Sequence, residues 1–439
     1  MLDTVRNMFK IPELRKKIFF TLAIVFAYRL GGHVPTPGVN TEVLRGFLAA
    51  NSDGLFGLFD MFVGGSFGRF SVFALGIMPY ITASIILQLM GTIFPYFHKL
   101  QREGAEGRKK LTQYTRYGTV VFAAIQAIGI SIFMSGVQDN GVQAVIPQMR
   151  GFLFMFTTVI SLTTGTVLTM WLGEQITARG VGNGISLLIF IGIIAEIPGS
   201  VAAQVRMVMA DQGHVATALF ILTIVLLATV AVVIMTQAMR RIPIQTPKKV
   251  VGTKMYAGQN TVLPLRLNMA GVIPIIFASS IMTFPGMIIR GFAGAETSVF
   301  MEDVFRLFGP DGFVYPLMFG VLIVFFTYFY TAIVFNPVDI ADNLKRQGGF
   351  IPGIRPGKKT AEFIENVLTR ITLPGSVFLA LIAVLPMMLM RSMGGFHFGG
   401  ASILIVVGVS LDTLQQLESH LQMRNYDGFM KKGTLRGRR

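Results

Sequence analysis

Few residues in this chain have the types and spacing that catalysis or metal binding requires. There is no cysteine, which excludes disulfides, thiolate ligands and cysteine nucleophiles. The five histidines are scattered, and no HExxH pair places two of them on one helix face. We therefore expect no catalytic residue, no metal, no cofactor and no small-molecule substrate.

Two glycine-rich segments resemble nucleotide-binding motifs without the context that those motifs need. Residues 180–184 (GVGNG) lie between two apolar segments, and no strand precedes them. Residues 353–360 (GIRPGKKT) are one residue short of Walker A spacing and also follow no predicted strand. We interpret both as connections, and we find no ATPase in the chain.

Charges inside apolar segments are the remaining candidates, because each costs about 2.5–3.5 kcal/mol at the centre of a bilayer. Five of them fall near segment ends: Arg29, Glu174, Glu196, Arg290 and Arg391. The sixth, Asp412, lies in the inner part of the last segment. No midplane carboxylate, histidine or lysine forms a relay. The pattern argues against an ion-driven carrier and favours a passive conduit or a transporter of apolar cargo.

Membrane-spanning helices must position these residues. Hydrophobic residues make up 52% of the chain and charged residues 14%, against about 25% charged in soluble proteins. Ten segments are long enough to span a bilayer: 18–34, 72–95, 117–136, 152–172, 184–202, 215–237, 269–290, 313–335, 371–391 and 400–418. The first follows a basic stretch and no cleavage site follows it, so we expect it to remain as an anchor.

The basic residues predict the orientation. Every second connection and both terminal segments are basic, and together they hold 30 of the 38 lysines and arginines. Because such loops stay in the cytoplasm, both termini are predicted to be cytoplasmic.

We divide the chain into a cytoplasmic segment (1–17), an N-terminal half (18–202), a C-terminal half (203–418) and a basic tail (419–439). Five spans per half, starting on opposite sides, predict inverted repeats.

Residues 55–70 (LFGLFDMFVGGSFGRF) are apolar but too short to span. Such a segment lies either on the surface or, as a re-entrant element, inside a pore.

The two long loops, about 238–268 and 336–370, each carry six basic residues. Positive-inside topology explains part of this charge, and a basic docking face for lipid, RNA or an acidic protein explains the rest.

Several longer strings carry a resemblance to a known family. They are MPYITASI (78–85), QYTRYG (113–118), WLGEQIT (171–177), GNGIS (182–186), NMAGVIP (268–274), FNP (335–337) and IPGIRPG (351–357). In this order they resemble bacterial SecY over about residues 5–435. The resemblance implies an all-α polytopic membrane protein with two inverted five-helix halves around an hourglass pore. It also implies a protein-conducting channel of the bacterial inner membrane that releases apolar segments sideways.

The resemblance implies roles for particular residues. An apolar ring should seal the pore, and its two pairs spaced i, i+4 each share a helix face: Ile81, Ile85, Ile189, Ile193, Ile276 and Ile405. The short segment resembles the plug that caps this ring, with Phe56, Phe59, Asp60, Met61, Phe62, Gly64, Gly65 and Phe67. Thr82, Gln126 and Ser280 match a polar cluster at the lateral gate, although local bonds to the backbone are an alternative role.

Partners follow from the same resemblance. The two basic loops correspond to the family's docking surface for the ribosome and the SecA motor, through Lys248, Lys249, Lys254, Arg355, Lys358 and Lys359. SecE and SecG are the expected subunits, and a nascent chain or preprotein with its signal sequence is the cargo. There are three rival hypotheses: an inverted-repeat secondary transporter, a non-channel insertase or scaffold, and an intramembrane enzyme. The transporter would need a midplane site.

Overall fold

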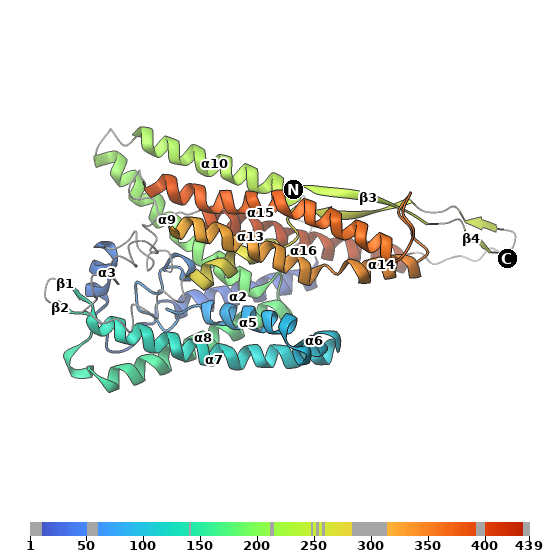
Figure 1. Ribbon diagram of the computed structural model, residues 1–439. Helices are drawn as coiled ribbons and strands as arrows, with labels where there is room; N and C mark the ends of the chain where they lie inside the picture. Colours follow the sequence, from blue (N-terminus) through green and yellow to red (C-terminus); the bar gives the residue numbers. More distant parts are fainter. Residues whose placement is uncertain are drawn as a thin grey trace.

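The computed structural model describes residues 11–50, 60–139, 142–210, 215–246, 249–251, 254–256, 260–282, 314–391 and 400–432. Within these ranges the chain forms a bundle of long helices (Figure 1). Seven helices are long and apolar enough to cross a membrane, and a bent pair adds an eighth. These spans confirm the all-α membrane fold.

The helices of the N-terminal half coincide with the predicted spans but are mostly longer. They are α2 (Pro12–Gly31), α5 (Met78–Ile93), α7 (Ala105–Gly136), α8 (Phe152–Arg179) and α9 (Gly184–Ala210). Helix α7 packs against both α5 and α8, and α8 packs against α9. Between α7 and α8, the guanidinium of Arg116 makes two hydrogen bonds of 3.0 and 2.6 Å to the carboxylate of Glu174. This half is therefore one packed unit.

The C-terminal half contains α10 (Val215–Gln237), a short helix (Ile273–Met282), α13 (Val314–Val334), α15 (Lys358–Arg391) and α16 (Gly400–Lys432). The predicted span 269–290 is described only as far as Met282, and the rest of it lies outside the described residues. Helix α16 packs against α10 and α15 in its own half and against α9 in the other. The two halves thus share one hydrophobic core.

The second predicted span needed correction at both ends. Residues 72–77 form turns, so the helix begins only at Met78 rather than at residue 72. It ends at Ile93 because Phe94, which precedes a proline, adopts an extended conformation. The chain then turns by 105° into α6 (Pro95–Arg102), and α7 begins at Ala105. The basic connection that we expected between the second and third spans is therefore mostly helical.

The two ends of the bundle differ. One end carries α6, the strands β3 to β6 and α14 (Pro337–Arg346), and we call it the basic end (Figure 1). The opposite end carries α3 (Thr41–Ala50), the short strands β1 (Gln138–Asp139) and β2 (Val142–Gln143), and the single turn η1 (Pro147–Met149). Long helices connect the two ends, as a membrane-spanning bundle requires.

The described parts of the two long basic loops contact each other. In the first loop, β3 (Met239–Gln245) pairs in antiparallel register with β6 (Asn260–Arg266), and β4 (Lys249–Val251) pairs with β5 (Lys254–Tyr256) further out. Gln245 exchanges two 2.9 Å backbone hydrogen bonds with Phe350 of the second loop. A small hydrophobic core lies beneath: Ile242, Leu265, Ile351, Ile364, Val367, Leu368 and Ile371. We call this combined unit the platform.

Candidate pore and plug

Six isoleucines that the sequence analysis singled out are buried in one hydrophobic cluster. Their exposed fractions lie between 0% and 6%: Ile81, Ile85, Ile189, Ile193, Ile276 and Ile405. They come from α5, α9, the helix Ile273–Met282 and α16, which belong to both halves of the chain. The fold therefore brings together residues that are up to 324 positions apart in the sequence.

The predicted plug is described from Asp60 onward, and Phe56 and Phe59 lie outside the described residues. Residues 60–63 are helical, and Met61 is buried. Val63 and Phe67 belong to the same buried cluster as the isoleucines, and Phe62 packs at its edge. The hydroxyl of Ser402 on α16 lies 3.3 Å from the Met61 sulfur. The segment therefore lies inside the bundle, and the surface alternative is wrong for the described residues.

The backbone of the candidate plug segment contacts α9. A Cβ built on Gly192 would lie 2.8 Å from the Phe62 carbonyl oxygen and 3.4 Å from the Gly64 nitrogen. Only a residue without a side chain at position 192 allows this approach. Because Ile193 is the next residue, the contact lies beside one of the six isoleucines.

Two glycines and one carboxylate shape the turn after the plug helix. Gly64 and Gly65 have φ angles of 71° and 74°, a left-handed conformation that side chains disfavour. The Asp60 carboxylate accepts hydrogen bonds of 2.8 and 2.9 Å from the amides of Phe67 and Gly68. Burial raises the pKa of the Asp60 carboxyl to about 6, and the nearby Glu196 carboxylate adds to this rise. At neutral pH a mostly ionised Asp60 closes the turn.

Two arginines attach the turn to its surroundings. Arg29 of α2 donates a 3.1 Å hydrogen bond to the Gly64 carbonyl, and Arg69 donates one of 2.9 Å to the Gly65 carbonyl. Arg69 also contacts the His33 ring, whose other nitrogen is 2.8 Å from the Arg29 carbonyl. The sequence analysis missed His33 and the role of Arg29, because nothing in their spacing relates them to residue 64.

The three predicted gate residues are buried, but no hydrogen bond joins them to one another among the described residues. The Thr82 hydroxyl donates to the Met78 carbonyl of its own helix at 3.1 Å, as the alternative role predicted. Ser280 instead reaches across to α5, where its hydroxyl lies 3.4 Å from the Met78 sulfur. Gln126 is 3% exposed, and its carbonyl oxygen has no partner among the described residues. The sequence analysis did not single out Met78.

Five of the six predicted docking residues lie in described parts of the two loops, and Lys248 lies outside the described residues. Lys358 and Lys359 are exposed at the start of α15, and Arg355 is exposed three residues before it. The Arg355 carbonyl accepts a 2.9 Å hydrogen bond from the Thr360 hydroxyl. Lys249 and Lys254 are the first residues of β4 and β5.

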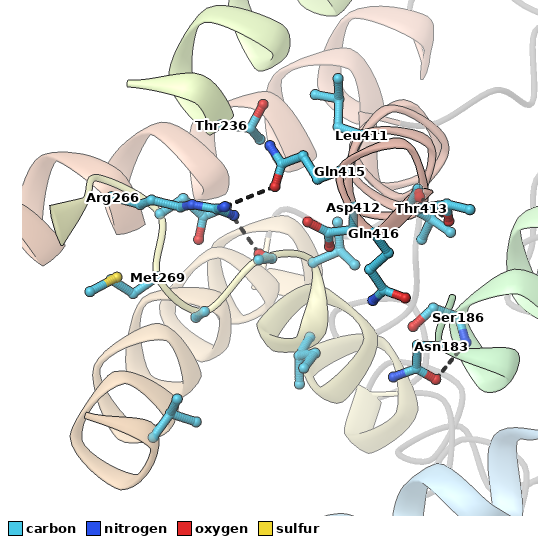
Figure 2. A pocket seen from close by; sticks show the side chains of 18 of the residues that line it. Asn183, Ser186, Thr236, Arg266, Met269, Leu411, Asp412, Thr413, Gln415 and Gln416 are labelled. Carbon is cyan, nitrogen blue, oxygen red and sulfur yellow. Dashed lines mark hydrogen bonds between the residues drawn. The ribbon is translucent and has the colours of Figure 1, made fainter. Parts of the chain in front are cut away.

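A cavity of about 430 Å³ lies toward the basic end of the bundle, and Figure 2 shows side chains that line it. The last residue of β6, the first turn of α9 and the middle of α16 line it, including Arg266, Asn268, Asn183, Asp412 and Gln415. Arg266 donates a 2.8 Å hydrogen bond to the Gln415 carbonyl oxygen. We call this cavity the vestibule.

Long apolar helices that pack around one buried hydrophobic cluster define a helical membrane protein. A family model described as SecY matches residues 71–414, and the chain belongs to the SecY family. The chain is 46% identical over 441 residues to the protein translocase subunit SecY of Streptomyces griseus, covering 98% of this chain and all of the relative. The protein is a protein-conducting channel.

Two solved structures share the fold. One is described as the structure of a protein conducting channel, with a TM-score of 0.61, 17% identity, and coverage of 94% of this chain and 96% of the other. The second, Sec61 in a canine ribosome-channel complex, has a TM-score of 0.56 and 16% identity over the same shares of both chains. These likenesses confirm the fold, and membership of the SecY family disfavours the transporter hypothesis.

Proposed function

We propose that the six isoleucines form the seal of this channel and that residues 55–70 are its plug. The contact of the plug backbone with Gly192, beside Ile193, is the observation that carries this assignment. A ring of apolar side chains excludes ions because water does not wet it. It still parts around a polypeptide, since it offers no strong binding site. The energy for transport then comes from outside the chain.

We further propose that the channel opens sideways between α5 and the helix Ile273–Met282. The supporting contact is the hydrogen bond from Ser280 to the Met78 sulfur. Polar contacts between membrane helices contribute about 1 kcal/mol each. A polar contact of this strength is weak enough for an apolar segment to separate the two helices and enter the lipid.

The proposed partners bind at the basic end, which we assign to the cytoplasm of a bacterium because basic loops remain there. The platform would dock the ribosome, as the Sec61 channel does in the canine complex, and the SecA motor. SecE and SecG remain the expected subunits. Among the described residues, no group of three or more potential metal ligands occurs.

A reversible lock between plug and α16 tests the plug assignment. The chain has no native cysteine, so Met61→Cys with Ser402→Cys introduces two unique thiols at a contact of 3.3 Å. We expect a short, reducible bifunctional thiol reagent to block translocation into membrane vesicles by about tenfold or more, since the plug must leave the ring. Reduction should restore the rate.

The two single-cysteine variants, treated with the same reagent, control for modification of one thiol. Undiminished translocation by the fully cross-linked double variant would show that residue 61 does not move during transport. The plug assignment would then be wrong.

The docking proposal predicts a charge-dependent affinity. Reversing two exposed cations with Lys358→Glu and Lys359→Glu should weaken ribosome binding to detergent-solubilised protein, and the loss should be largest at low salt. Each lost phosphate contact lowers the slope of log affinity against log salt by about 1, so we expect a change of about 2. Arg150→Glu, an exposed reversal at the opposite end, is the matched control. An equal change in both variants would rule out a platform-specific contact.

A further inference from the structure

Five ionisable side chains from three parts of the chain surround the turn that follows the proposed plug helix. They are Asp60 and Arg69 of the plug segment, Arg29 in the last turn of α2, His33 just beyond that helix, and Glu196 of α9. A Cβ built on Gly65 would overlap the Glu196 carboxylate and lie 2.7 Å from a guanidinium nitrogen of Arg69. The plug turn therefore lies against a carboxylate that belongs to α9.

The groups around Asp60 act on its proton in opposite directions. Burial has the largest effect and raises the pKa of the Asp60 carboxyl, and the Glu196 carboxylate raises it further. The amides of Phe67 and Gly68 and the charge of Arg69 lower it. The balance raises the pKa of Asp60 from its ordinary 3.8 to about 6. In the closed channel, Asp60 thus binds a proton more tightly than a solvated aspartate does.

Displacement of the plug would remove the influences that favour the proton and keep those that oppose it. Asp60 accepts its hydrogen bonds from Phe67 and Gly68, which lie with Arg69 in the same proposed plug, residues 55–70. These groups move together. The Glu196 carboxylate and the buried surroundings belong to the seat that the plug leaves. Opening therefore lowers the pKa of Asp60, and a proton bound there passes to water.

We propose that acidity on the side opposite the basic end holds the plug shut, because the closed channel binds a proton at Asp60 that the open channel releases. The inference rests on the proposed plug. His33 is exposed, contacts Arg69 and precedes α3, which lies at that end (Figure 1). The stabilisation is complete below the ordinary pKa of aspartate and disappears as the pH rises through about 6. The seal is then tightest when the outside holds most protons.

His33 acts in the opposite direction and has to be separated from Asp60. Its ring contacts the Arg69 guanidinium, which can only donate, so the ring nitrogen accepts. Protonation of the ring would remove this acceptor and place two cations side by side. Acid would then loosen the contact instead of strengthening it. The amide of His33→Gln keeps an acceptor that does not titrate, so this variant isolates the effect of Asp60.

The open fraction of the channel tests the inference, measured in planar bilayers that contain the complete channel complex, with the pH varied on one side at a time. Acidification from about pH 8 to about pH 5 opposite the basic end should lower the open fraction about tenfold, as a pKa of about 6 against 3.8 requires. The same change at the basic end should have no effect. Asp60→Asn, which has no proton to release, should give one low value at both pH values. Glu196→Gln should reduce the response.

Three controls make the outcomes decisive. Glu42→Gln removes an exposed carboxylate of α3 at the same end and should keep the tenfold response, and His33→Gln should keep at least that response. A variant without residues 57–67 should conduct at every pH. If it is tight, the proposed plug is wrong. If it conducts while wild type ignores acid, opens in acid, or shares its response with Asp60→Asn, this inference alone is overturned. Loss of the response in His33→Gln would also overturn it.

Discussion

Replacing Ile405 with asparagine is expected to make the closed channel leak ions. Ile405 is fully buried in the same cluster as the other five isoleucines, and it is the residue that α16 contributes to the proposed seal. An amide at this position binds water, which lowers the cost of wetting the constriction for a passing ion. In planar bilayers containing the purified protein with the proposed SecE subunit, we expect wild type to be tight and Ile405→Asn to conduct. A variant without residues 57–67 should also conduct.

Ile403→Asn separates a loss of the seal from a loss of stability. Ile403 is 2% exposed on the same helix, but it lines an apolar cavity between α9, α10 and α16 rather than the proposed ring. Burying an amide there costs a similar free energy, so stability should fall in both variants. Of the two asparagine variants, only Ile405→Asn should conduct. Equally tight bilayers for Ile405→Asn and the deletion would show that these residues do not seal the pore.

Replacing Gly192 with valine is expected to displace the plug while every ring isoleucine stays in place. The new Cβ would lie 2.8 Å from the Phe62 carbonyl oxygen, which is backbone and cannot rotate away. Overpacking of this kind costs about 1–3 kcal/mol. If this cost disappears when the proposed plug leaves its contact with α9, the population of the channel with a displaced plug rises by about 5- to 150-fold. Bilayer recordings should then show more frequent openings. Cross-linking between Met61→Cys and Ser402→Cys should slow in this background.

Gly199 provides the control on the same helix. A Cβ at Gly199 meets no atom within 4 Å, so Gly199→Val adds the same side chain to α9 without a clash. We expect it to leave both the openings and the cross-linking rate unchanged. Should Gly192→Val and Gly199→Val behave alike, the plug does not depend on close contact with α9, and the assignment of its seat would be wrong.

Helix positions were predictable from the sequence because the bilayer dictates their length and polarity. The predicted span 215–237 coincides with α10, and 313–335 differs from α13 by one residue at each end. Helix ends with basic residues were less predictable. The charge of the segment from Lys358 to Arg370 predicts a loop, but the segment forms the start of α15. It is helical because Ile364, Val367 and Leu368 pack against the strands β3 and β6. A hydropathy criterion does not distinguish an amphipathic helix outside the membrane from a charged loop.

The sequence by itself determined the membrane class, the alternation of basic and neutral connections, and the residue types of a candidate seal. These properties depend on local composition, which every segment carries independently of its neighbours. Only the tertiary structure decided which residues meet. Gly192 against Phe62, Ser402 against Met61, and Ser280 against Met78 are pairs that are distant along the chain. Their partners are set by helix packing, because a glycine or a serine has many possible roles until a specific neighbour approaches it.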